Sequence, residues 1–187
     1  GFLSLREALQ LANIGGTIDG QTGSSGFIAD TITFDPSLDG LPIILTAGPL
    51  TITGSSRITI TGNGASNTII NAAGPSPIFE IPPGAGATPL DGLRRLDGQT
   101  IAADQSGAAI RSNGGHLLIR NSTLSGNSTL GTSSEGGAIY QRNNDLSIFN
   151  SILINNSTTG TGSRGGAIFN LFGDVIITGS RLENNST

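Results

Sequence analysis

The sequence contains no cysteine, methionine, tryptophan or lysine, and only 12% of its 187 residues are charged. Without cysteine, the chain can form neither disulfide bonds nor thiolate metal sites. The net charge of −4 and the lack of a basic stripe argue against nucleic acid as a partner. No apolar run approaches the roughly 18 residues of a transmembrane helix, so no membrane-spanning helix is predicted.

Glycine is the abundant residue, with 29 copies, and serine, threonine and asparagine supply most of the remaining polar positions. Isoleucine and leucine recur in short runs that resemble strands and are separated by turn residues. This pattern favours a folded, β-rich chain over a disordered one.

A repeat of 29 residues dominates the second half of the sequence, where three copies agree at about a dozen positions without an insertion. Equivalent positions include Ile110, Ile139 and Ile168; Leu117, Leu146 and Val175; Ile119, Ile148 and Ile177; Leu124, Leu153 and Leu182; and Asn127, Asn156 and Asn185. The spacing predicts that these residues lie directly over one another in successive coils of a solenoid.

Each repeat contains short pieces in which apolar and polar residues alternate, such as Leu146-Ser147-Ile148, and none has the length or spacing of a helix. We therefore predict three strands per coil, with a loop over 128–135 that is repeated at 157–164. A single coil buries too little to stand alone, so stability must come from stacking. The asparagine column is predicted to lie at a bend with left-handed backbone, where its amides bond to the next coil.

We predict one β-helix domain over residues 1–187. It comprises an N-terminal cap helix within 1–16, irregular early coils over 30–81, a loop and transition over 82–106 in which Leu93 to Ile101 re-enters the coil, and three repeat coils over 107–187, the last one incomplete. Ser4 and Glu7 form a capping-box pattern at the start of the helix, which would cover the open apolar end of the solenoid. No matching cap follows the last coil, and we expect the chain to be part of a longer protein.

Several motifs resemble those of bacterial secreted and surface proteins that fold as right-handed parallel β-helices. The segment from Ser4 to Leu9, followed by Ala12-Asn13, is similar to their "SLREAI…AN" opening, and the segment from Asp30 to Asp35 continues that pattern. The Gly-Gly-Ala-Ile and Asn-Ser-Thr elements resemble the repeats of chlamydial-type polymorphic outer-membrane proteins. Leu3 stands where the family often has cysteine. The resemblance implies the right-handed parallel β-helix fold, export to the cell surface or beyond, and a role in adhesion or envelope structure.

Two columns of side chains are candidate ligand-binding sites. Arg111, Tyr140 and Phe169 follow the isoleucine column and should face outward, where an arginine stacked on two aromatic rings could hold a sugar. A ladder of stacked aromatics with no ligand is the structural alternative.

His116, Asp145 and Asp174 form the second column, in which two carboxylates one coil apart could share a cation or raise the pKa of one of them. The alternative is three solvated turn residues that precede strands. We predict no catalytic set, no cofactor and no metal site, because the chain lacks lysine and shows no pair of carboxyl groups facing each other across a cleft.

These observations favour a non-enzymatic surface or extracellular scaffold: an adhesin-like passenger, or an envelope or assembly subunit with a protein or carbohydrate partner. The alternative is a carbohydrate-active enzyme or sugar-binding module acting on extracellular polysaccharide. Unpaired parallel strands at the last coil would also permit end-to-end self-association.

Overall fold

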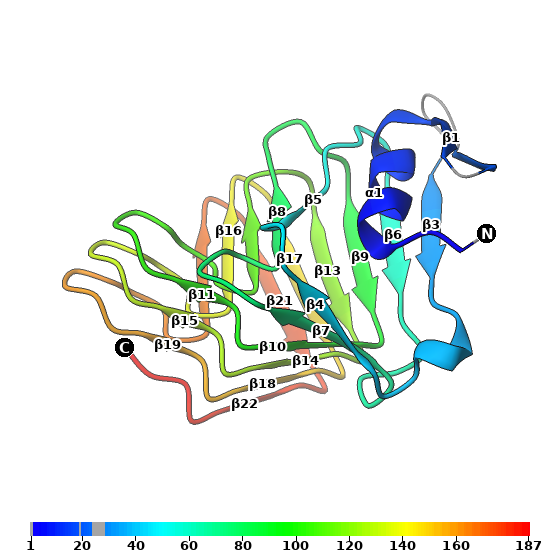
Figure 1. Cartoon of the computed structure of the whole chain (residues 1–187). Coiled ribbons are helices and arrows are strands. Elements are labelled where there is room, and N and C mark those ends of the chain that lie inside the picture. Colours follow the sequence, from blue (N-terminus) through cyan, green and yellow to red (C-terminus); the bar gives the residue numbers. More distant parts are fainter. Residues whose placement is uncertain (1, 19, 24–28) are drawn as a thin grey trace.

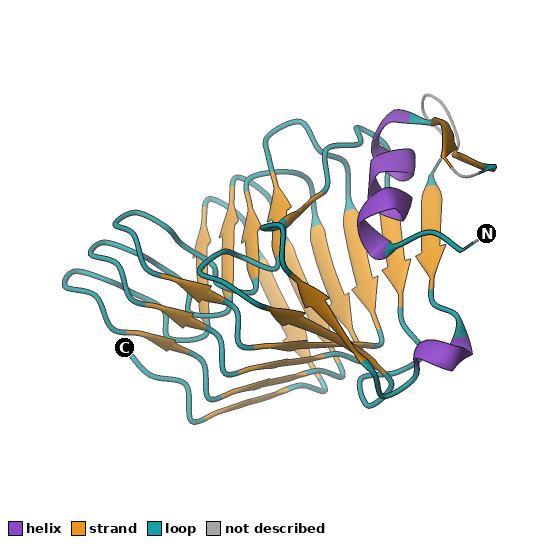
Figure 2. Cartoon of the chain, in the orientation of Figure 1, coloured by secondary structure: helices purple, strands orange, loops and turns teal. Residues whose placement is uncertain are grey.

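In the computed structural model, which describes residues 2–18, 20–23 and 29–187, the chain winds into a parallel β-solenoid of about five turns. Strands of successive coils lie side by side along the solenoid, and the one α-helix of the described residues lies at its N-terminal end (Figures 1 and 2). The predicted parallel β-helix with a short N-terminal helix is confirmed.

The described strands form four parallel sheets and one antiparallel hairpin. The first sheet contains β3 (Asp30–Thr33), β6 (Ile58–Thr61), β9 (Thr88–Asp91), β13 (Leu117–Arg120), β17 (Leu146–Phe149) and β21 (Val175–Thr178). The second contains β4 (Pro42–Leu45), β7 (Thr68–Ala72), β10 (Leu93–Leu96), β14 (Thr123–Ser125), β18 (Ile152–Ile154) and β22 (Arg181–Glu183). The third contains β5 (Leu50–Thr51), β8 (Phe79–Ile81), β12 (Ile110–Ser112), β16 (Ile139–Arg142) and β20 (Ile168–Leu171). The fourth contains β11 (Gln99–Thr100), β15 (Ser128–Thr129) and β19 (Ser157–Thr158).

The fourth sheet corrects the prediction of three strands per coil. Its strands have two residues each and begin at Ser128 and Ser157, where we had placed the start of the loop. Such short strands carry no alternation that sequence reading can detect, because a period of two needs several residues to appear. The connections to the third sheet therefore begin two residues later than predicted.

Register in the later coils follows the spacing of the sequence repeat. Ile110 pairs with Ile139, and Ile139 pairs with Ile168, so equivalent residues of successive repeats lie directly over each other. Earlier coils are less regular, because the distance along the chain between register partners varies: 28 residues for Asp30 and Ile58, 25 for Thr68 and Leu93, and 31 for Phe79 and Ile110.

Residues 82–106 hold more of the coil than we predicted: β10 and β11 lie within the segment expected to re-enter it, whereas β9 occupies part of the predicted loop. All three strands pair with the following coil at the same spacing as the repeats. Proline had argued against a strand there, because it donates no ladder hydrogen bond. Pro89 is tolerated because the pairing of β9 with β6 begins at Leu90, the residue that follows it.

Single residues with left-handed backbone turn the chain from one sheet to the next. Asn121 and Asn150 have φ of 46° and 49° between the first and second sheets. Asn155 and Asn184, at 56° and 52°, serve the bend after the second sheet. Asparagine tolerates this conformation better than most residues. The bend thus lies one residue before the asparagine column, and not in it as predicted.

Two polar ladders run through the interior beside the apolar columns. Oδ1 of Asn156 accepts hydrogen bonds from the backbone N–H and the side-chain Nδ2 of Asn127, at 3.1 and 2.8 Å. Asn185 accepts equivalent bonds from Asn156, at 3.0 and 2.9 Å. In the second ladder, Oγ of Ser122 and Ser151 accepts from the backbone of the preceding coil. Each coil therefore makes side-chain hydrogen bonds to the next as well as backbone ones.

Helix α1 (Leu5–Ile14) covers the N-terminal end of the interior. The predicted capping box is present, because Ser4 accepts from the backbone of Glu7 while the Glu7 carboxylate accepts from that of Ser4. Leu5 and Leu9 are buried against the core. The helix is also held by Arg6, which donates to the carbonyls of Gly48 and Pro49. The predicted cap helix is therefore held to the solenoid by apolar packing and by hydrogen bonds.

Asn13 of α1 bonds to the exposed edge at and just beyond β5. Its Oδ1 accepts from the N–H groups of Thr53 and Gly54 at 2.7 and 3.0 Å, and its Nδ2 donates to Thr51 O at 2.8 Å. We expect Asn13→Ala to lower the free energy of unfolding by about 1–2 kcal/mol, since three backbone groups lose their partner, two of them in exposed and one in a partly buried hydrogen bond. Urea unfolding measures this, with the exposed Gln10→Ala as the matched control, which should stay near wild type. Equal values for the two variants would contradict this role of Asn13.

The C-terminal coil exposes positions that are buried in the coil before it. Val175, Ile177 and Leu182 are 43%, 40% and 44% exposed, whereas their register partners Leu146, Ile148 and Leu153 are fully buried. The difference arises because nothing in the structure stacks on the last coil. No helix in the described part of the chain is long and apolar enough to cross a membrane.

Candidate functional site

The outer face of the third sheet carries the first candidate column. Arg111, Tyr140 and Phe169 lie in register on β12, β16 and β20, as the spacing predicted. Glu80 of β8 precedes Arg111 in the same column. The column thus consists of an acidic residue, a basic residue and two aromatic residues, with one residue from each of four successive coils.

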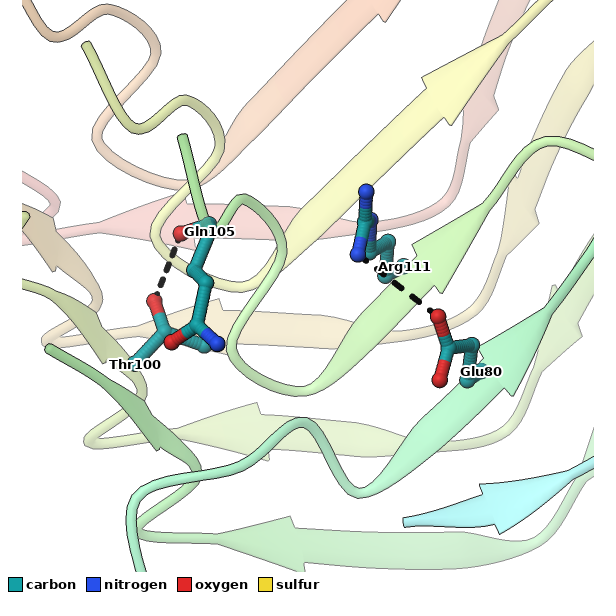
Figure 3. Close-up of polar contacts among 4 residues, drawn as sticks. All are labelled: Glu80, Thr100, Gln105 and Arg111. Carbon is teal, nitrogen blue, oxygen red and sulfur yellow. Dashed lines mark hydrogen bonds and ion pairs between the residues drawn. The ribbon is translucent and has the colours of Figure 1, made fainter. Parts of the chain in front are cut away.

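Arg111 does not lie over the rings as expected. Its Nη1 is 3.6 Å from Oε1 of Glu80, and both side chains are somewhat over one-third exposed (Figure 3). An exposed ion pair of this kind contributes about 0–1 kcal/mol. The cation–π contacts of the described residues involve other arginines: Arg95 over Phe79, and Arg120 over Phe149.

Tyr140 and Phe169 stack on each other, with ring centroids 5.9 Å apart and planes within 6°. The rings are parallel and stacked, so each ring turns one face toward the other. A sugar usually binds by covering the face of a ring. Because these two rings are stacked and not side by side, they do not form a flat platform for it. The geometry matches the ladder alternative and leaves only the end faces for a ligand.

The second column, His116, Asp145 and Asp174, lies at the turn that precedes the first sheet, and all three residues are exposed. The backbone carbonyls of Asp145 and Asp174 accept from Leu117 and Leu146, which confirms that they occupy equivalent positions. Oδ1 of Asp145 also accepts from the backbone N–H of Asp174 at 3.0 Å. This carboxylate therefore joins two coils.

His116 is hydrogen-bonded to Ser147, a residue that sequence analysis did not identify. Its Nε2 lies 2.9 Å from Oγ of Ser147, which is only 5% exposed and lies on the next coil. A histidine beside a serine hydroxyl has the spacing of a base and nucleophile, but no described carboxylate is hydrogen-bonded to the histidine ring. Among the described residues, no group of three or more His, Cys, Asp or Glu side chains could hold a metal ion.

The connections from the fourth sheet to the third stack on one another and project from the solenoid (left in Figure 1). Oγ1 of Thr100 donates to Gln105 O at 2.7 Å and closes the first of them (Figure 3). A Cβ on Gly160 would lie 1.9 Å from Gly131 O, so only glycine permits this close stacking. The loops therefore form an ordered row of similar surfaces.

Comparisons with protein-family models, curated proteins and solved structures find no match for this chain. The fold places the protein in the class of parallel β-solenoids.

Proposed function

We propose that this chain is a non-enzymatic β-helix scaffold that acts at the cell surface or outside the cell, as an adhesin-like passenger or an envelope or assembly subunit. The observation that carries the proposal is that the candidate polar side chains of the second column make hydrogen bonds between coils. The Asp145 carboxylate accepts from the backbone N–H of Asp174, and the His116 ring is hydrogen-bonded to the Ser147 hydroxyl, so each of these two side chains is bound to the next coil. The stacked row of loops supports the same proposal, because it offers a partner a regular surface on a rigid support.

Incubation of the intact protein with a panel of acidic and neutral polysaccharides tests the proposal. We expect no new reducing ends or unsaturated products above a control without protein. Product formed by the wild type and abolished by Asp145→Asn would overturn the proposal in favour of a carbohydrate-active enzyme. Retention of a polysaccharide without cleavage, lost in Phe169→Ala but kept in Phe149→Ala, would favour a sugar-binding module that uses the outer face of the aromatic pair.

A further inference from the structure

An unpaired strand edge lies at the N-terminal end of the first sheet. β3 is the last strand of this sheet, and among the described strands it pairs with β6 alone. The N–H of Asp30 donates to Arg57 O at 3.1 Å, so Asp30 and Ile32 direct their backbone groups to β6. Because successive residues of a strand alternate sides, Thr31 and Thr33 direct their N–H and C=O groups to the open edge.

A pocket of about 600 Å³ adjoins this edge. Its walls come from α1, β2 (Gln21–Gly23), β3 and the segment that follows β3, and all residues of β3 line it. Most of its other lining side chains are apolar, among them Leu11, Phe34, Leu38 and Ile43. This volume lies in the range of pockets that bind ligands, so it has room for an apolar side chain of a docked peptide. Backbone donors and acceptors therefore border a space that accepts apolar groups.

The charged residues that line the pocket are all acidic. Asp30 and Asp35 are the charged residues among its described lining residues. Hydrogen bonding from Ser37 holds the pKa of Asp35 below its ordinary value, so this carboxylate is ionised at neutral pH. The whole chain carries a net charge of −4 as well. A ligand with positive charge is favoured both at the pocket and at long range.

We propose that β3 is a docking edge for an extended peptide of another protein, which adds as a strand beside Thr31 and Thr33, places an apolar side chain in the pocket and sets basic residues near Asp30 and Asp35. Only a strand satisfies a row of alternating backbone donors and acceptors, and strand addition draws its affinity from those bonds and its specificity from pockets for alternate side chains. The inference does not depend on the scaffold proposal, because an enzyme could carry the same edge.

The probe is a seven-residue peptide that alternates valine and threonine, with arginine at both ends and blocked termini. Calorimetric titration of the intact protein should show binding, and the NMR amide signals of Thr31 and Thr33 should shift. Two N-methylated forms of the peptide, blocked on opposite sets of alternate amides, test strand pairing on the unaltered protein. One form should bind about tenfold weaker or worse and the other near normally, since each lost hydrogen bond costs on the order of 1 kcal/mol.

Thr33→Pro removes one N–H from the open edge and leaves the pairing with β6 intact, because Thr33 does not donate to β6. We expect it to weaken the peptide several-fold, whereas Thr33→Val should bind as wild type does. Equal effects of the two N-methylated forms, amide shifts confined to β20–β22, or equal binding of a peptide with glutamate in place of arginine would each overturn the proposal. So would a dimer that the peptide fails to displace, because the edge would then bind a second copy of the chain.

Discussion

Asn156→Ala is expected to lower the free energy of unfolding by about 3–4 kcal/mol. Asn156 is fully buried and its amide joins three coils. Its oxygen accepts two bonds from Asn127, and its nitrogen donates to Leu124 O and to Oδ1 of Asn185 at 3.1 and 2.9 Å. Alanine removes these bonds from the N–H and Nδ2 of buried Asn127 and from Leu124 O, at about 1–3 kcal/mol for each fully buried group, whereas Asn185 keeps the bond from the backbone N–H of residue 156.

Urea unfolding followed by far-ultraviolet circular dichroism measures this loss. Asn144→Ala is the matched control, because Asn144 makes a single bond, to Gly114 O, and is only partly buried. Its cost should stay near about 1 kcal/mol. Asn156→Asp should also be destabilising at neutral pH, since a carboxylate can accept from Asn127 but cannot donate to Leu124. Similar losses for Asn156→Ala and Asn144→Ala would show that the ladder contributes no more than an ordinary hydrogen bond.

The later coils could be predicted from the sequence because identical residue types recur at a fixed spacing. Three copies of Asn-Ser-Thr and of the alanine-isoleucine pair define the columns without any knowledge of the strands. The left-handed bends could not be assigned in the same way. Asn155 and Asn156 are adjacent and chemically identical, yet one turns the backbone and the other bonds between coils. Only the path of the chain separates these two roles.

The coil before the repeats was recognised only in part, from Leu93 onward, because its residue types differ while its spacing is unchanged. Counting back by one repeat from Leu124 leads to Arg95, and from Leu118 to Pro89. Neither residue is typical of a buried strand, so composition favoured a loop. Extending the spacing by one copy, in spite of composition, would have found β9 and aligned β10 and β11 with the repeats.

The outer column was predicted in position but not in its contacts. Register placed Arg111, Tyr140 and Phe169 together, and the ring stack of the last two follows from that register. The partner of Arg111 could not be foreseen, because Glu80 precedes the repeats and its distance from Arg111 along the chain differs from their spacing. The opposite charge of Glu80 offers Arg111 an ion pair on one side, in competition with the ring of Tyr140 on the other.

Arg95 presents a sharper conflict between composition and position. It lies on β10 in register with Ile70 and Leu124, is fully buried, and stacks over Phe79 with its guanidinium carbon 4.9 Å from the ring centre. Its three guanidinium nitrogens have no hydrogen-bond partner. Burial lowers the pKa of Arg95 to about 9. A buried charge without a counter-ion costs several kcal/mol, and contact with one ring returns about 2 kcal/mol of this.

We therefore expect Arg95→Met, which keeps most of the side-chain length, to raise the free energy of unfolding at pH 7 by about 1–4 kcal/mol. The gain should shrink above pH 9. There the folded wild type releases the proton that the unfolded chain keeps, so the unfolded state binds more protons and wild-type stability rises with pH. The chain has no lysine or cysteine, and its single tyrosine is common to both proteins. A difference in the pH dependence of stability between the two proteins in this range therefore reports on Arg95.

Urea unfolding of both proteins between pH 7 and 10.5 tests the expectation. Arg120→Met is the control, because Arg120 also lies over a ring, that of Phe149 at 5.9 Å, but is exposed to solvent. It should change stability by less than about 1 kcal/mol at every pH. A loss of stability in Arg95→Met at pH 7 would mean that the contact with Phe79 outweighs the cost of burying the charge. A gain that persists undiminished to pH 10.5 would mean that the guanidinium stays protonated in the core, and that the solenoid tolerates a permanent charge in a column that is otherwise aliphatic.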